Sequence, residues 1–196
     1  MKRRTQHDSH PEKKPQQGMT LIEVLIAMLV MTVGMGGLLA LFMTAATSTN
    51  RNSKDTSATL LAQMVLEQIS AQHPDSTATI NLTDCAGNAW TVATAGGASP
   101  AGAGAAVDQN SASLSYGSID QTQQYAAVSA NYAMQYTDCD TNGHQTVYDV
   151  RWNVMTITAN STRLITVTAR QNNVTSNQLG NARFAIPVTL RGIGAP

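Results

Sequence analysis

One carboxylate, Glu23, stands in an otherwise apolar stretch that runs from Met19 to Met43. A charged side chain at the centre of a bilayer costs about 2.5–3.5 kcal/mol on insertion scales, and less near the interface. A buried charge is tolerated when an opposite charge lies close to it. The position of Glu23 therefore predicts that a positive charge compensates it.

The two cysteines, Cys85 and Cys139, could react with each other. If the chain after the apolar stretch lies outside the inner membrane, its compartment is oxidising and one intramolecular disulfide is expected. The bridge would close a loop of about 55 residues and stabilise the fold by roughly 4 kcal/mol in the chain-entropy model. The chain has no C-x-x-C motif, and His73 and His144 lack zinc-ligand spacing, so zinc is not expected.

A third group of polar side chains fits the calcium-loop template. Asp138, Asp140 and Asn142 alternate along the chain, Gly143 follows, and Asp149 takes the twelfth position. Oxygen ligands at these positions could converge on a hard cation such as calcium. Because the flanking segments are predicted strands, a hairpin turn around Asn142-Gly143 explains the same residues. The turn is the favoured interpretation, calcium is the alternative, and no other metal or cofactor is expected.

Composition argues against a nucleic-acid binder, and the lack of catalytic motifs argues against an enzyme. Only 12% of the 196 residues are charged, with 12 basic and 12 acidic side chains, so a dense basic surface is not expected. The sequence also lacks a Ser/His/Asp motif, a phosphate-binding glycine loop that opens a helix, and carboxylates in a recognisable pocket pattern. An enzyme is therefore not expected.

The elements that position Glu23 are a basic leader and an apolar helix. The first 18 residues carry five basic and two acidic side chains. Residues 19–43 are long enough to cross a bilayer as a helix with a rise of about 1.5 Å per residue. This order predicts a cytoplasmic start and a remainder that crosses the membrane. A secretory signal peptide is the rival interpretation, but its apolar core is usually shorter, roughly 7–15 residues.

The helical pattern continues beyond the apolar stretch. Leu61, Met64 and Val65 fall on one helical face. His73-Pro74 ends the pattern, because the residue before a proline disfavours helical backbone. One long helix is therefore predicted over 19–72, membrane-spanning in its first half and amphipathic in its second.

The rest of the chain is predicted as a loop-rich region followed by a sheet. Small and polar residues dominate 73–131, with 96–106 as the most flexible part. Residues 132–196 alternate apolar and polar side chains, as strands buried on one face do. Pro187 indicates that the last strand lies at an edge or pairs only partly. The candidate strands are 132–137, 146–154, 163–170 and 183–191. The expected fold class is α+β, with the amphipathic part of the long helix packed on an antiparallel sheet of three or four strands.

The residues G-MTLIEVLIAML after a basic leader resemble the class III signal of type IV prepilins and pseudopilins. The glycine, the glutamate at the fifth position after it and the apolar run together make this signal specific. The resemblance implies that a prepilin peptidase removes residues 1–18 by cutting between Gly18 and Met19, and that Met19 becomes N-methylated. It also implies that Glu23 pairs with the amino terminus of a neighbouring subunit, which would supply the compensating charge.

Within this family the chain looks most like the minor pilins of the PilV type, on the residues LIEVLIAMLVMTVGMGGLL and on YDVRWNV followed by RLITVTAR. This resemblance implies the type IV pilin fold and a structural subunit of low copy. Such a subunit joins major and minor pilins, helps the assembly platform of the inner membrane prime the pilus, and sits in or at the filament tip, in some members with an adhesin. The expected location is the inner membrane in a single pass, with a periplasmic carboxyl-terminal part, and then the extracellular pilus.

Three alternatives stay open. Abundance would distinguish a major pilin, and gene neighbours would distinguish a type II secretion pseudopilin. A DNA-uptake (competence) pilin would need a basic patch, which could be built on a net acidic domain only by Arg151, Arg163, Arg170, Arg183 and Arg191. Phosphate binding needs a denser basic stripe, so nucleic acid is not an expected partner.

Overall fold

The computed structural model describes residues 18–141, 143–158, 162–172 and 186–194. The chain divides into two compact units, one ending at Ser48 and the other beginning at Thr49. Within the described residues, the first unit consists of helix and the short segment before it, whereas the second unit contains all the strands.

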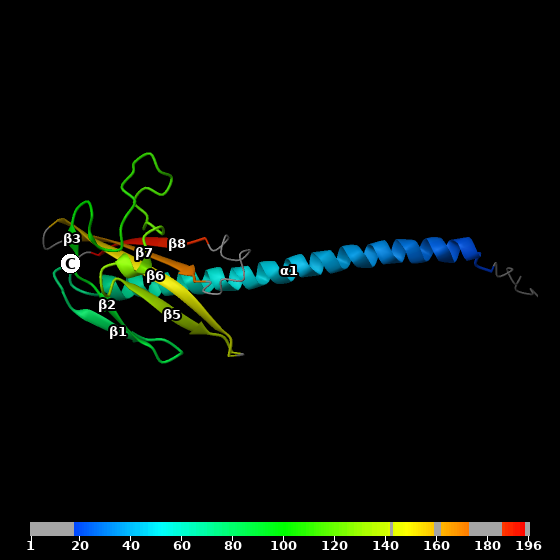
Figure 1. Ribbon diagram of the computed structural model, residues 1–196, viewed down its shortest axis with the longest axis horizontal. Coiled ribbons are helices and arrows are strands. Elements are labelled where there is room, and N and C mark those ends of the chain that lie inside the picture. Colours follow the sequence, from blue (N-terminus) through cyan, green and yellow to red (C-terminus); the bar gives the residue numbers. More distant parts are fainter. Residues whose placement is uncertain (1–17, 142, 159–161, 173–185, 195–196) are drawn as a thin grey trace, which may run out of the picture. The chain divides into compact units, whose positions relative to one another are not determined.

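Helix α1 spans Leu21–Ser70 (Figure 1). No proline interrupts this range, and its residues are mostly good helix formers such as Leu, Met and Ala. A turn follows the helix, and His73-Pro74 lies just beyond it, where a proline disfavours helical backbone in the preceding residue. The long helix predicted from the sequence is confirmed.

A six-stranded sheet forms the centre of the second unit. Its four long strands are antiparallel neighbours in chain order, so each pairs with the next. They span Ala133–Cys139 (β5), Gln145–Thr158 (β6), Thr162–Gln171 (β7) and Val188–Gly194 (β8). The antiparallel sheet predicted for 132–196 is confirmed, and β8 is the terminal strand of the sheet, as Pro187 indicates.

The middle of the chain holds more regular structure than its composition predicts. Strands β1 (Thr79–Thr83) and β2 (Ala89–Ala93) form an antiparallel hairpin with its own two-stranded sheet. Two short strands extend the main sheet: β3 (Gly97–Ala98) pairs with β6 in parallel, and β4 (Ala103–Gly104) pairs with β6 antiparallel. The loop prediction was wrong at these four strands, because small and polar residues mask short extended segments.

A glycine lets the chain around β4 lie directly on β6. Gly104 has a φ of +113°, and a Cβ there would collide with the carbonyl oxygen of Trp152 and the ring of Tyr132. Only glycine combines this backbone conformation with so close an approach. The next residue, Ala105, donates its backbone N–H to the Trp152 carbonyl at 2.9 Å. The segment predicted as the most flexible is therefore a partner of the sheet.

The core lies between the second half of α1 and the inner face of the sheet. Five helix side chains are buried: Ala58, Leu61, Ala62, Val65 and Ile69. The sheet side chains in this cluster are Met134, Tyr148, Val150, Trp152, Val154, Ile165, Val167 and Ala169. Full burial of one such aliphatic side chain contributes about 1.5–3 kcal/mol. The helical face predicted around Leu61 and Val65 is confirmed as the face that packs on the sheet.

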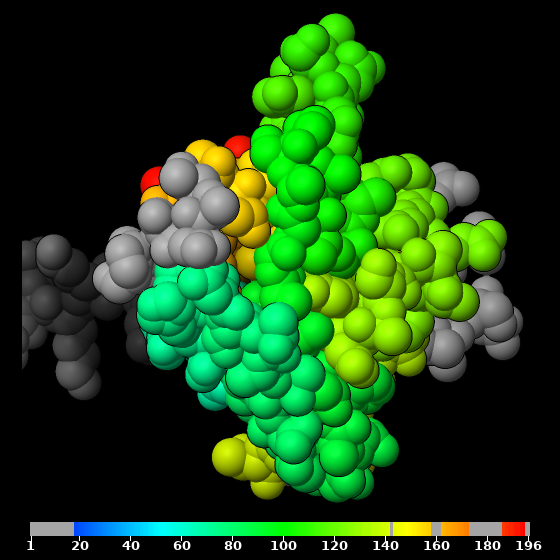
Figure 2. All heavy atoms as spheres, turned by 90° about the vertical axis from the view of Figure 1, so that its left-hand side faces the viewer, coloured from blue at the N-terminus to red at the C-terminus, as the bar shows by residue number. Residues whose placement is uncertain are grey.

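Residues 101–127, here called the covering segment, include the short strand β4 and otherwise cover the face of the sheet opposite to α1. Asn153 of β6 donates from Nδ2 to the carbonyls of Ala101 (3.0 Å) and Ala105 (2.8 Å). Part of the covering segment projects from the second unit, in green in Figure 2. Because of this cover, Asp149, Arg151 and Asn153 are buried. The prediction that strands are buried on a single face was therefore wrong for β6.

Candidate functional site at the start of the helix

Gly18, Met19 and Thr20 form the described chain before α1, and all three are exposed. The Thr20 carbonyl accepts hydrogen bonds from the backbone N–H groups of Glu23 (3.0 Å) and Val24 (3.3 Å). The helix therefore starts directly after Thr20. The Gly18–Met19 peptide bond lies in exposed, non-helical backbone, which a processing peptidase could reach.

Glu23 lies in the first turn of α1 and is exposed. The amino end of a helix carries a partial positive charge, which favours an acidic side chain there by about 0.3–1 kcal/mol. Within the described residues no ion pair to Glu23 is formed. No described residue supplies the compensating charge for Glu23, which therefore stays a prediction.

The apolar side chains around Glu23 are not covered by the described chain. Leu21, Ile22, Leu25 and Ile26 are between 56% and 82% exposed. The most apolar part of α1 is not buried, and by length and composition the helix could cross a membrane. Apolar surface of this extent marks contact with a membrane or with other proteins.

A disulfide joins Cys85, in the turn between β1 and β2, to Cys139 at the end of β5. The two Cα atoms are 6.0 Å apart, within the usual range for a bridge. This is the pairing that the sequence predicts for an oxidising compartment. The bridge attaches the hairpin to the main sheet.

A buried carboxylate, Asp84, lies next to this bridge. Its Oδ1 accepts a hydrogen bond from the Asn88 backbone N–H at 2.8 Å. Its Oδ2 accepts from Asn88 Nδ2 (2.9 Å), Trp90 Nε1 (3.2 Å) and the Thr137 backbone N–H (3.2 Å). The sequence analysis does not identify Asp84, although the signal was present: residues 84–88 contain Asp, Gly and Asn, and an Asp in a turn commonly accepts hydrogen bonds from nearby backbone N–H groups.

Acid is expected to weaken the second unit through Asp84. Burial raises the pKa of this carboxyl, but the hydrogen bonds from Asn88, Trp90 and Thr137 together hold the pKa well below its ordinary value of 3.8. Because the pKa is lower in the folded chain, the stabilisation is complete above about pH 4 and is lost as the pH falls toward the folded value. Denaturant unfolding, measured at pH values from neutral to strongly acidic, gives the free energy of unfolding at each pH. This free energy should fall less steeply with acid for Asp84→Asn than for the wild type. Equal slopes would contradict this prediction.

The candidate calcium ligands do not form one set. Asp138 lies in β5, Asp140 lies in the turn that follows, and Asn142 is outside the described residues. Asp149 lies further along β6, where arginine side chains bind it. In the described ranges, no group of three or more His, Cys, Asp or Glu side chains is placed to hold a metal ion.

The β5–β6 connection has the features of a hairpin turn. Gly143 has a φ of +81°, which favours glycine. The Asp140 carboxylate accepts from the His144 backbone N–H at 2.8 Å and lies 3.0 Å from His144 Nδ1. These contacts close the turn, which is the favoured sequence interpretation of this motif.

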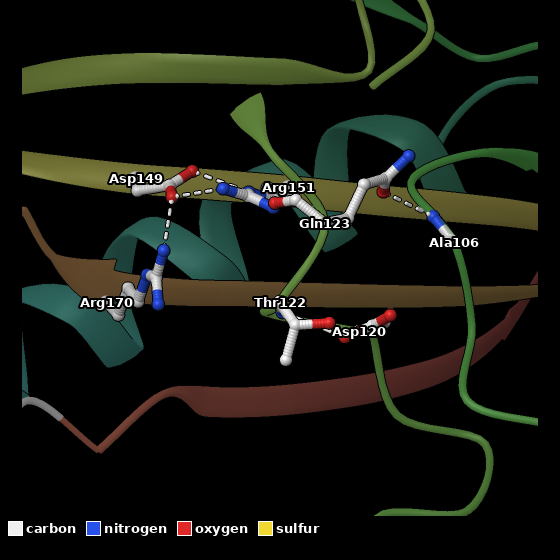
Figure 3. A network of polar contacts seen from close by, with 7 residues as sticks. All are labelled: Ala106, Asp120, Thr122, Gln123, Asp149, Arg151 and Arg170. Atoms are coloured by element: carbon white, nitrogen blue, oxygen red, sulfur yellow. Dashed lines mark hydrogen bonds and ion pairs between the residues drawn. The ribbon is translucent and has the colours of Figure 1, made fainter. Parts of the chain in front are cut away.

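A buried ion-pair network holds the covering segment on β6 (Figure 3). Arg151 donates from Nε and Nη2 to the two oxygens of Asp149, at 2.9 and 2.7 Å. Arg170 donates to the same carboxylate at 3.2 Å. Arg151 also donates from Nη1 to the Gln123 carbonyl (2.6 Å), and Gln123 Oε1 accepts from the Ala106 backbone N–H (2.8 Å). Two guanidinium groups thus share one carboxylate, and Arg151 also binds the covering segment, so the network helps to hold this segment on the sheet.

Among the arginines considered for DNA binding, the four that the structure describes do not form a common basic patch. Arg151 and Arg163 are buried, with 2% and 1% exposure, and Arg170 is bound to Asp149. Arg191 is exposed, and Arg183 lies outside the described residues. The phosphate contacts of a nucleic-acid binder need exposed cations, which Arg151 and Arg163 are not.

Arg163 instead binds the carboxyl end of α1 from strand β7. Its Nη2 donates to the carbonyls of Ile69 and Gln72, and its Nη1 donates to the Thr94 carbonyl at 3.1 Å. The last turn of α1 has no basic residue of its own, so this guanidinium supplies the positive charge that a helix end favours. Burial lowers the pKa of Arg163. A signal was present in the sequence, because Arg163 alternates in phase with the apolar Ile165 rather than with the polar side chains.

A family model described as a prokaryotic N-terminal methylation motif matches residues 13–39. No curated protein and no solved structure matches the chain. The matched range contains Gly18, Met19 and Glu23, the three residues that the structure places before and in the first turn of α1. The motif supports a type IV pilin-like protein that is processed by a prepilin peptidase and assembled with other pilins.

The fold agrees with this conclusion. A long amino-terminal helix and a sheet in an α+β arrangement are consistent with the type IV pilin fold. The motif points to a structural subunit rather than an enzyme. Together with the apolar helix, it supports anchoring in a membrane followed by incorporation into a pilus.

Proposed function

We propose that the chain is a minor type IV pilin of the PilV type, a structural subunit that helps prime pilus assembly and sits in or at the tip of the filament. The observation that carries the proposal is Glu23, the fifth residue after Gly18, in the first turn of an apolar helix that has no cover from the described chain. An exposed carboxylate among exposed apolar side chains is suited to an interface between subunits, in which the carboxylate and the apolar side chains become buried together.

Processing would create the partner for Glu23. Cleavage between Gly18 and Met19 frees an amino group at Met19, and N-methylation leaves that nitrogen able to carry a positive charge. In the apolar centre of a filament, this cation on one subunit would pair with Glu23 of its neighbour. Neither charge alone would be tolerated there, because burying an unpaired ion costs on the order of several kcal/mol.

The order of segments supports a topology for this subunit. The basic leader would stay in the cytoplasm, where prepilin peptidase acts, and residues 19–43 would cross the inner membrane. The second unit would then lie in the periplasm, and its Cys85–Cys139 disulfide suits that oxidising compartment. From there the assembly platform would move the subunit into the pilus.

A major pilin and a type II secretion pseudopilin share the same motif, and their abundance and location distinguish them. Quantitative mass spectrometry of sheared filaments from the native host should find this chain at a small fraction of the main subunit. Deletion of its gene should reduce the number of pili. Amounts equal to the main subunit would indicate a major pilin. Absence from surface pili, with loss of protein secretion on deletion, would indicate a pseudopilin.

A further inference from the structure

The disulfide lies at a turn that burial does not fix. Cys85 is exposed and Cys139 is half-buried, so their two sulfur atoms are not held together by a surrounding core. The residues of this turn, 84–88, are exposed apart from Asp84. Within the described residues, the Asp84 carboxylate makes a side-chain hydrogen bond from this turn to β5.

Asp84 and Cys85 contact the same backbone residue of β5. Asp84 Oδ2 accepts from the Thr137 backbone N–H at 3.2 Å, and Cys85 Sγ lies 3.0 Å from the Thr137 carbonyl oxygen. Thr137 precedes Cys139 by two residues in the same strand. The hydrogen bonds from Asn88 and Trp90 orient the carboxylate toward β5. These contacts hold the turn, and Cys85 with it, next to the strand that carries Cys139.

We propose that Asp84 is the positioning residue for disulfide formation: its carboxylate docks the β1–β2 turn on β5 in the dithiol protein and so brings the Cys85 thiol to Cys139. The two cysteines are 54 residues apart, and closing a flexible loop of that length carries a large entropic cost. In the folded dithiol chain, the packing of the core and the Asp84 contacts have already brought the two ends of this loop together. The carboxylate would then raise the effective concentration of the two thiols.

The oxidation can be followed with glutathione as the oxidant. The Cys85 thiolate attacks glutathione disulfide, which forms a mixed disulfide and releases one glutathione thiolate. The Cys139 thiolate then attacks the Cys85 sulfur and releases the second glutathione. Two electrons pass from the protein thiols to glutathione, and the protons of the two thiols go to solvent or to the released thiolates.

The test equilibrates the full chain, in detergent micelles at neutral pH, with mixtures of reduced and oxidised glutathione. Alkylation of free thiols and intact mass then give the fraction of disulfide. Asp84→Asn should lower the effective thiol concentration by about tenfold or more, equivalent to about 30 mV in potential. The substitution puts an amide NH₂ in the place of Oδ2. This NH₂ cannot accept the hydrogen bonds that Asn88, Trp90 and Thr137 donate, so the turn is no longer held on β5.

Two variants serve as controls. Asp138→Asn makes the same charge change next to Cys139 at a carboxylate for which the structure shows no hydrogen bond to the turn, so its effect should stay within about twofold. Val167→Ala removes methyl groups from the buried core, at a site away from the turn, and so destabilises the fold in general. Its effect on the effective thiol concentration should also stay within about twofold. The proposal would be overturned if Asp84→Asn equalled the wild type, or if either control shifted the potential as far as Asp84→Asn does.

Discussion

Glu23→Gln is expected to remove the protein from filaments while its leader is still cleaved. Glutamine keeps the size and polarity of the side chain but cannot pair ionically with an amino terminus. Breaking a buried ion pair by removing one partner costs about 3–5 kcal/mol, because the other charge is left unpaired. At about 1.4 kcal/mol per factor of ten, incorporation should fall by about a hundredfold or more. Immunoblots of sheared filaments and of membranes measure the two pools.

The matched control for this prediction is Glu67→Gln on the same helix. Glu67 is exposed and accepts a hydrogen bond from Gln63 at 2.8 Å, so its loss makes the same change in charge at a surface position of the second unit. Surface substitutions of this kind usually change stability by about 0.5 kcal/mol or less. Glu67→Gln should therefore reach filaments at the wild-type level. Wild-type incorporation of Glu23→Gln would show that the carboxylate does not dock the subunit.

Arg163→Met is expected to destabilise the second unit strongly. Methionine approximates the aliphatic part of the side chain but removes the guanidinium donor from the carbonyls of Ile69, Gln72 and Thr94. Of these, the Ile69 carbonyl still accepts from the Gln72 backbone N–H at 3.1 Å. A hydrogen bond to a charged group contributes about 1.5–3 kcal/mol, and a buried acceptor without a partner adds a penalty of similar size. We expect the free energy of unfolding to fall by about 3–5 kcal/mol. Denaturant unfolding followed by tryptophan fluorescence measures this change.

Arg191→Met provides the control, because it removes a guanidinium from an exposed site. Arg191 donates to the Tyr116 carbonyl at 3.2 Å in an exposed contact, so the loss should be below about 1 kcal/mol. The loss of unfolding free energy for Arg163→Lys should lie between those of the two methionine variants, because a single ammonium group reaches fewer of the three carbonyls. If Arg163→Met and Arg191→Met were equally stable, the capping role of Arg163 would be wrong.

The sequence identifies the helix and the long strands because their patterns are regular. The face of Leu61 and Val65 repeats with the helical period, and β6 and β7 alternate with the period of a strand, so both give clear signals. Pro187 correctly indicates a strand at the edge of the sheet. The disulfide follows from there being two cysteines in a chain whose compartment is predicted to be oxidising.

The contacts made by the covering segment could not be predicted in the same way. Asp149 and Arg151 alternate with apolar residues and so look like the solvent face of a strand, yet both are buried. Their cover comes from a segment of small and polar residues whose position depends on Gly104 and on contacts distant in sequence. Local patterns do not carry such tertiary information, and the same limit explains why Asp149 fits a calcium template while it binds Arg151 and Arg170.

The start of the helix differs from the second unit, because the described chain does not cover its side chains. The pattern around Gly18 and Glu23 is specific in sequence, and the structure adds that Glu23 and its apolar neighbours are exposed. A single chain therefore gives the chemistry of this site but not its counterpart. That counterpart has to be measured in membranes and filaments.

Intact-mass analysis of the protein from membranes and sheared filaments of its native host tests the central claim most directly. The account predicts a mature species that begins at N-methylated Met19, lacks residues 1–18 and is present in the filaments. A chain that retains residues 1–18 and is found only in the membrane fraction would contradict it, and would leave a membrane-anchored domain that does not enter a pilus.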